Sequence, residues 1–167
     1  PGAITRLIDM EIEPFLIASS IEMVIAQRLV RRLCNVCASP AGMEEGQFRA
    51  NLALLGVQGE GVANSDKVLR SVGCQQCQNL GYRGRVGIFE IMTMSDAIHS
   101  LVIKNAAAPD IRRVAVEEGM RSLQLSGWEQ IKRGLTTFEE VIRYSDGFGT
   151  DNGNGHHEEI SSETQTV

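Results

Sequence analysis

The sequence predicts an α+β fold, in which a small strand-containing region carries an inserted tetracysteine subdomain and is followed by a compact helical bundle. All four cysteines lie between residues 34 and 77, in two pairs with the same C-x-x-C spacing. Residues 85–92 are rich in β-branched and aromatic side chains, which is typical of a strand. From residue 95 onward, apolar side chains recur at helical spacing, and residues that begin and end helices separate the runs.

Composition limits the classes of protein to consider. With 167 residues, 43% of them hydrophobic, the chain is long enough to bury a core without crosslinks. A net charge of −5 argues against a protein whose main task is to grip phosphate backbones. No window approaches 18 uncharged apolar residues, so we expect no membrane span. The N-terminus does not resemble a secretion signal, and we expect reduced cysteines in the cytoplasm.

The pattern of the first 33 residues predicts two short helices and leaves one segment ambiguous. Residues 3–10 carry apolar side chains at i, i+3 and i+4, which indicates an amphipathic helix. Pro14 suits the first turn of a second helix that runs through Ser19. Residues 21–33 fit one helical face and also fit a mostly buried strand. Periodicity alone slightly favours the helix.

The cysteines form the pairs Cys34/Cys37 and Cys74/Cys77. Two C-x-x-C pairs can place four sulfurs about 2.3 Å from one zinc ion, which closes a tetrahedral and therefore structural site. There are three alternatives: two disulfides, a redox pair of thioredoxin type, or unpaired buried thiols. Disulfides are disfavoured because a chain of ordinary hydrophobic content does not need crosslinks. A redox pair is disfavoured because that motif normally occurs once, whereas this chain has two copies. The pairs are separated by residues 38–73, against ~15–20 residues in a compact zinc finger. A metal bound here would hold together the two ends of an inserted subdomain.

The insert has its own predicted elements. An i, i+4, i+7 stripe of Phe48, Leu52 and Leu55 predicts a helix that forms the core of the insert and ends at Gly56. A short strand is expected over residues 67–72.

Four helices are predicted after residue 94, each with a start signal. Ser95 can cap the first, Pro109 suits the first turn of the second, and Ser122 begins the third. Thr137 and Glu140 have the spacing of a capping box for the fourth. Together these helices are expected to form the compact bundle.

Five arginines flank the cysteine pairs: Arg28, Arg31, Arg32, Arg83 and Arg85. Four thiolates around one divalent cation leave a charge of about −2, so nearby arginines can stabilise the site electrostatically. Contacts at a subunit interface are the next interpretation, for which Arg28, Arg32, Arg83 and Arg85 are the candidates. Nucleic-acid binding is the least favoured.

Six stretches of this chain resemble, in the same order, the C-terminal third of the type II secretion and type IV pilus-assembly ATPases. They are residues 3–10, 13–20, 26–34, 81–90, 119–123 and 134–141. The resemblance covers about residues 3–144. Because separate motifs recur collinearly around a tetracysteine insert, the resemblance is more specific than any one of them.

The resemblance implies that Cys34, Cys37, Cys74 and Cys77 bind a structural Zn²⁺. It also implies a strand leading to the first cysteine, against the helix that periodicity favours. The parent protein would be a cytoplasmic homo-hexamer that uses ATP and Mg²⁺ to drive rotation of subunits against an inner-membrane platform protein, and would lie peripherally at the inner-membrane face. No nucleic-acid partner is implied.

The sequence contains no G-x-x-x-x-G-K-[ST] loop to hold ATP phosphates. Because the family carries this loop upstream, we expect the chain to be the non-catalytic C-terminal part of a longer motor, with a structural and assembly role. Its expected parts are the end of the ATPase core (1–33), the zinc-binding subdomain (34–80), a strand with the C-terminal helices (81–145), and a disordered tail (146–167).

Other classes of function remain to be weighed against the motor. The main alternative is a free-standing zinc-ribbon module that binds nucleic acid or a protein partner. A redox enzyme would require reversible disulfide formation at one cysteine pair. The cysteine-rich module of Hsp40 chaperones has eight cysteines, of which this chain has only half.

Overall fold

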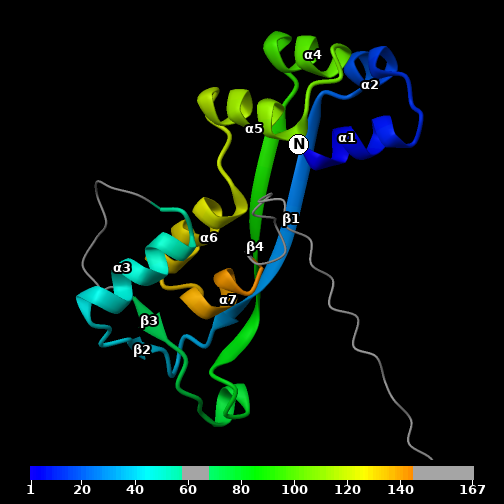
Figure 1. Ribbon diagram of the computed structural model, residues 1–167. Helices are drawn as coiled ribbons and strands as arrows, with labels where there is room; N and C mark the ends of the chain where they lie inside the picture. Colours follow the sequence, from blue (N-terminus) through cyan, green and yellow to red (C-terminus); the bar gives the residue numbers. More distant parts are fainter. Residues whose placement is uncertain (58–67, 145–167) are drawn as a thin grey trace, which may run out of the picture.

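A long antiparallel ribbon forms the axis of the molecule, which we describe from a computed structural model covering residues 1–57 and 68–144. Its strands are β1 (Met23–Leu33) and β4 (Tyr82–Thr93). Helices gather near one end of this ribbon and beside its middle, and the cysteine-bearing loops lie at the other end (Figure 1). The tail predicted to be disordered, residues 146–167, lies outside the described residues.

The helix that periodicity favoured over residues 21–33 is wrong, and the strand implied by the family resemblance is confirmed. Met23 lies opposite Thr93 and Arg31 opposite Arg85, with an irregularity in the register between Arg31 and Leu33. Alternate side chains point to opposite faces of such a ribbon. One face buries Val30, Ile88 and their neighbours under the helices, whereas the other leaves a row of apolar side chains exposed: Met23, Ile25, Leu29, Phe89 and Ile91.

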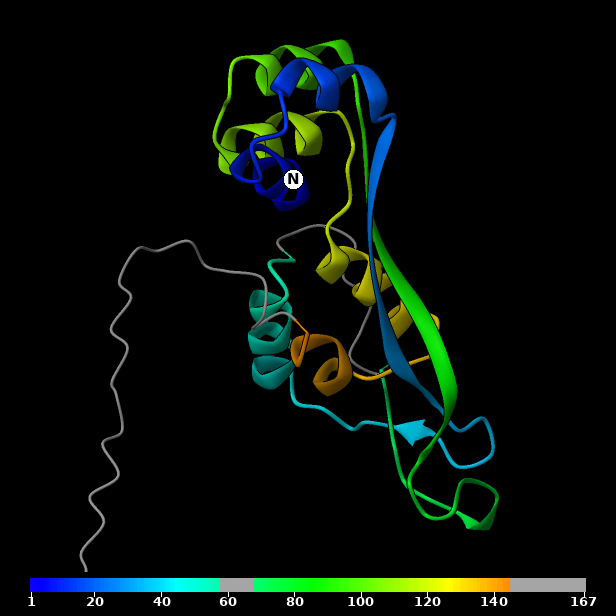
Figure 2. The ribbon, with the colours of Figure 1, turned by 90° about the vertical axis from the view of Figure 1, so that its right-hand side faces the viewer.

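The first group of helices covers the end of the ribbon where the chain begins (Figure 2). It consists of α1 (Gly2–Asp9), α2 (Pro14–Ser20), α4 (Asp96–Ile103) and α5 (Ala108–Glu117). Their shared core includes fully buried Ile4, Val102 and Ile111. The helices expected over residues 3–10 and from Pro14 are thus both present, and each packs against segments far away in the sequence.

The second group consists of α3 (Glu45–Leu54), α6 (Leu123–Lys132) and α7 (Phe138–Ile142). It packs on the inner face of the ribbon through α6 and α7, and α3 lies on the side of these helices away from the ribbon (Figure 2). Their rings meet in one cluster, with centroids 6.1 Å apart for Phe48 and Trp128 and 6.0 Å for Phe48 and Phe138. Helix α3 therefore shares a core with the C-terminal helices and does not form a separate core for the insert. The α+β class is confirmed, with the four helices after β4 divided between the two groups.

Short elements connect α3 to the cysteine loops. Strand β2 (Ser39–Pro40) pairs with β3 (Leu69–Arg70), so the strand expected over residues 67–72 has only two residues in the described part. The 3₁₀ helix η2 (Gln75–Cys77) connects the second cysteine pair, with Cys74 as its N-cap residue and Cys77 as its last residue.

The predicted helix caps have a mixed outcome. The hydroxyl of Ser95 accepts from the backbone N–H of Ile98, and that of Ser122 accepts from the N–H of Leu125, so both caps are confirmed. The capping box at the start of α7 is wrong, because Thr137 makes no cap hydrogen bond there. Its partner in the box, Glu140, accepts hydrogen bonds from Arg31 instead.

Candidate metal centre

The four cysteine sulfurs meet at one point at the end of the ribbon. All four Sγ atoms lie within 4.8 Å of one another, and none is in a disulfide. The Sγ–Sγ distances are 3.9 Å for Cys34 and Cys74, 3.8 Å for Cys37 and Cys77, and 3.7 Å for Cys74 and Cys77. Thiolates held about 2.3 Å from a tetrahedral zinc stand about 3.8 Å apart. The donor set and its spacing therefore fit a tetrahedral metal ion closed to further ligands.

Backbone amides direct hydrogen bonds toward these sulfurs. The N–H of Gly73 donates to the Sγ of Cys37 (3.3 Å). The N–H groups of Cys74 and Gly81 donate to the Sγ of Cys77 (3.1 and 3.2 Å). Such bonds stabilise a thiolate, which is the form of cysteine that binds a metal.

Two glycines make this arrangement possible. Gly73 has φ +114° and Gly81 φ +74°, in the region that side chains with a Cβ rarely adopt. A Cβ on Gly73 would lie 2.7 Å from the carbonyl oxygen of Asn79, and one on Gly81 would lie 2.6 Å from the Cβ of Ser71. Both glycines are therefore required for the close approach of the two segments that flank the second cysteine pair, residues 71–73 and 79–81.

The thiols of Cys77 and Cys37 differ in pKa when no metal is bound. For Cys77, burial raises the pKa, but the N–H groups of Cys74 and Gly81 outweigh this effect and, with the neighbouring thiols, lower the pKa to about 6. For Cys37, burial raises the pKa to about 11, against the smaller effect of the N–H of Gly73. A thiol with a lowered pKa is a thiolate at neutral pH, which is the form that binds a metal.

The flanking arginines do not contact the sulfurs. Arg28, Arg32, Arg83 and Arg85 are all exposed. In residues 1–57 and 68–144, the hydrogen bonds to cysteine sulfur from other groups come from backbone N–H groups, and no arginine side chain donates one. Any stabilisation of the thiolates by these arginines therefore acts through space.

The fifth arginine belongs to a network that sequence analysis missed. The guanidinium of Arg31 donates to the carboxylate of Glu140 (2.6 Å) and lies over the ring of Tyr82, 4.1 Å from its centroid. The hydroxyl of Thr136 donates to the carbonyl of Arg31 (2.8 Å), and the Tyr82 hydroxyl is 3.1 Å from that of Thr137. This network fastens both strands to α7 just before the cysteine loops. Because Glu140 is 109 positions from Arg31, no local pattern could have indicated the contact.

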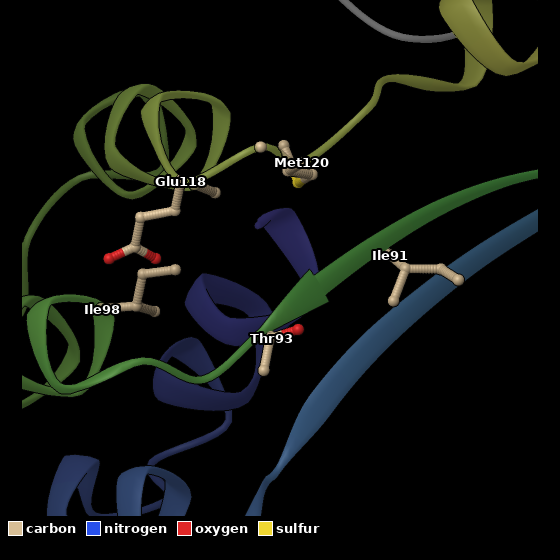
Figure 3. Close-up of a pocket in the computed structure, with 7 residues that line it drawn as sticks. Ile91, Thr93, Ile98, Glu118 and Met120 are labelled. Carbon is tan, nitrogen blue, oxygen red and sulfur yellow. The ribbon is translucent and has the colours of Figure 1, made fainter.

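A small pocket lies at the opposite end of the ribbon, between β4, α4 and α5 (Figure 3). It has a volume of about 170 Å³ and is lined by apolar side chains together with Thr93 and Glu118. The carboxylate of Glu118 already accepts a hydrogen bond from the Ser95 hydroxyl, at 2.8 Å. Its lining lacks a pair of groups suited to acid–base or nucleophilic chemistry, so the cysteine cluster is the candidate site.

The chain is similar in sequence to several known proteins. The family model described as type II/IV secretion system protein matches residues 1–143. The chain is 41% identical over 142 residues to the type IV pilus assembly ATPase PilB of Myxococcus xanthus, a match that covers 85% of this chain and 24% of that protein. It is 43% identical over 142 residues to the type II secretion system protein E of Pseudomonas aeruginosa, covering 85% and 27%.

A third relative, the type II secretion system ATPase E of Vibrio cholerae, is 37% identical over 151 residues, covering 85% of this chain and 27% of that protein. The chain thus spans about a quarter of the length of these relatives. In the described part of the chain, no helix is both long enough and apolar enough to span a bilayer. With a family model that matches residues 1–143 and relatives of about 40% identity, the chain belongs to the type II/IV secretion system protein family.

Proposed function

We propose that this chain is the zinc-binding C-terminal part of a motor ATPase of type II secretion or type IV pilus assembly. Cys34, Cys37, Cys74 and Cys77 are the zinc ligands. The observation that carries the metal assignment is that all four Sγ atoms lie within 4.8 Å of one another. Three of the six Sγ–Sγ distances are 3.7–3.9 Å, close to the spacing in a tetrahedral tetrathiolate site. With four protein ligands the ion has no position for water or substrate, so its role is structural.

The metal joins two segments that the sequence keeps far apart. The first cysteine pair follows β1 directly, and the second precedes β4. The backbone adds one bond between them, because the N–H of Cys34 donates to the carbonyl of Gly81 (3.0 Å). A bound ion closes this end of the ribbon and holds the cysteine loops in a fixed position relative to the strands.

The whole protein, in this proposal, is a homo-hexamer that binds ATP and Mg²⁺ through its other segments and acts on an inner-membrane platform protein from the cytoplasmic side. The names of the relatives, which are secretion and pilus-assembly ATPases, support this role. The exposed apolar row on the outer face of the ribbon supports packing against further protein, since monomers rarely leave such a contiguous surface in water.

This chain alone is expected to have no ATPase activity, because its sequence lacks the G-x-x-x-x-G-K-[ST] loop. The test of the motor role is the coding sequence upstream of the codon for Pro1. We expect a phosphate-binding loop there, and ATP hydrolysis by the protein that includes it. A continuous reading frame without such a loop, or a longer protein that does not hydrolyse ATP, would contradict the motor role and leave the metal site untouched.

A further inference from the structure

The end of the molecule that carries the cysteine loops has an unusual charge. Residues 30–43 and 68–86, which form this end, contain five arginines and no Asp, Glu or Lys: Arg31, Arg32, Arg70, Arg83 and Arg85. The whole chain has a net charge of −5, so this local excess of positive charge is opposite to the average. Of these arginines, Arg31 is neutralised by Glu140.

Three of the remaining arginines direct their charge to solvent. Arg32, Arg70 and Arg83 are exposed, and none forms an ion pair with any residue in the two described segments. None donates to a cysteine sulfur either. No carboxylate in the described residues therefore neutralises these three guanidinium groups.

Apolar side chains lie exposed on the same loops. Val36 is 55% exposed, Val72 53% and Leu80 64%, although each is one to three residues from a metal-ligating cysteine. A metal bound to the cysteines would fix the backbone that carries these side chains. Rigid apolar groups in water are favourable contacts for a partner, since little entropy is lost when they are covered.

The segments that carry the three apolar side chains lie next to one another. Gly81 touches Ser71 and Gly73 touches Asn79, so the segment 71–73 runs antiparallel to 79–81, and Val72 is brought beside Leu80. The N–H of Gly73 donates to the Sγ of Cys37, which brings the first cysteine loop, with Val36, against the segment 71–73. We call the exposed side chains of these loops and of the adjoining strand ends the knuckle surface: Val36, Val72 and Leu80 with Arg32, Arg70 and Arg83.

We propose that the knuckle surface binds an acidic segment of another protein that also presents apolar side chains. The apolar centre would be covered by aliphatic or aromatic anchors, and the arginines would pair with carboxylates around them, as in protein interfaces with an apolar core and a polar rim. Nucleic acid fits less well, because the knuckle surface offers no exposed aromatic ring for stacking and its centre is aliphatic.

The inference depends on the metal site of the proposed function, because the cysteine loops position all three apolar side chains. It does not depend on ATP hydrolysis or on a hexamer. Zinc content, measured on every variant below, separates a failure of the metal site from a failure of docking.

The test is selection of peptides from a random twelve-residue phage library on the immobilised, zinc-loaded chain. We expect enriched peptides with several Asp or Glu and at least two large apolar residues. Synthetic copies should bind at least tenfold more weakly to Arg32→Glu and to Leu80→Ser, measured separately by fluorescence anisotropy. The matched controls are Arg6→Glu and Leu54→Ser, which alter an exposed arginine on α1 and a leucine on α3 that is 62% exposed.

The result has clear alternatives. No enrichment, peptides without acidic residues, or binding that Arg32→Glu and Leu80→Ser leave unchanged in zinc-loaded protein would overturn the proposal. A 20-nucleotide DNA or a vesicle of phosphatidylglycerol that binds more tightly than any selected peptide at the same salt concentration would also overturn it. If the DNA binds in this way, its affinity for the chain should fall steeply as the salt concentration is raised.

Discussion

Glu140 of α7 binds Arg31 of β1 twice, accepting the backbone N–H at 3.0 Å with one carboxylate oxygen and the guanidinium at 2.6 Å with the other. Glu140 is 1% exposed, whereas the side chain of Arg31 is 45% exposed. The carboxylate thus replaces a strand neighbour at the free edge of β1 and holds α7 against the ribbon.

Replacing Glu140 with Gln should therefore destabilise the protein. The amide removes a charge-assisted hydrogen bond and leaves a buried group with poorer partners, which costs about 2 kcal/mol. Chemical denaturation of the zinc-loaded chain measures this change. The control is Glu139→Gln, an exposed neighbour on the same helix, which should have little effect. Equal effects of the two variants would show that the Arg31 contact contributes nothing to stability.

Acid should weaken the same contact. Burial raises the pKa of Glu140, but hydrogen bonds from the side chain and backbone of Arg31 outweigh it and hold the pKa below its ordinary value of 4.5. Because the folded state has the lower pKa, its stabilisation is fully present above pH ~4.5 and is lost as the pH falls through the folded-state value. Denaturation at a series of pH values should show a slope below pH ~4.5 that is smaller in Glu140→Gln; an unchanged slope would argue against this carboxylate as its source.

Gly81 should be required for metal binding. Alanine there would place a Cβ 2.6 Å from the Cβ of Ser71 and disturb the N–H that donates to Cys77. Gly84 is the matched control, since its φ of +78° is similar to the +74° of Gly81 but its Cβ would meet no atom within 4 Å. Zinc transfer to a chromophoric chelator should be at least tenfold faster from Gly81→Ala than from Gly84→Ala. Equal rates would show that the loss of zinc comes from the strained positive φ of alanine and not from the contact of its Cβ with Ser71.

Gly127 should be required for the packing of α6 on α7. A Cβ at this position would collide with the side chain of Val141. Alanine gains up to about 1 kcal/mol in helix propensity, but overpacking a filled core typically costs about 1–3 kcal/mol. We expect a net loss of about 1 kcal/mol for Gly127→Ala in thermal or chemical unfolding. In a double-mutant cycle, Gly127→Ala should cost less in the Val141→Ala background than in the original protein, and an equal cost in both would contradict the collision.

The cysteine cluster was predictable from the sequence because its signal is local, in two C-x-x-C pairs that each present two sulfurs. Helix starts at Ser95 and Ser122 were predictable for the same reason. In contrast, residues 21–33 could not be assigned from periodicity, because Ile25 and Leu29 match a helical face but stand exposed on the ribbon. Only the family resemblance indicated the strand.

Contacts between distant segments account for the remaining differences. The Thr137/Glu140 spacing of a capping box was present, but Glu140 pairs with Arg31 across the fold instead. The helix over Phe48 was expected to form the core of the insert, but Phe48 packs on Trp128 and Phe138 of the C-terminal helices. In each case the pairing of strands and helices, which a single sequence does not reveal, decided the outcome.

The metal content of the purified chain tests the central claim most directly. For folded protein prepared without chelators, elemental analysis should find about one zinc ion per chain, and Cys34→Ser should lose it, because the four sulfurs form a closed tetrathiolate site. Folded, fully reduced protein that contains no zinc and takes up none when zinc is added would contradict the account.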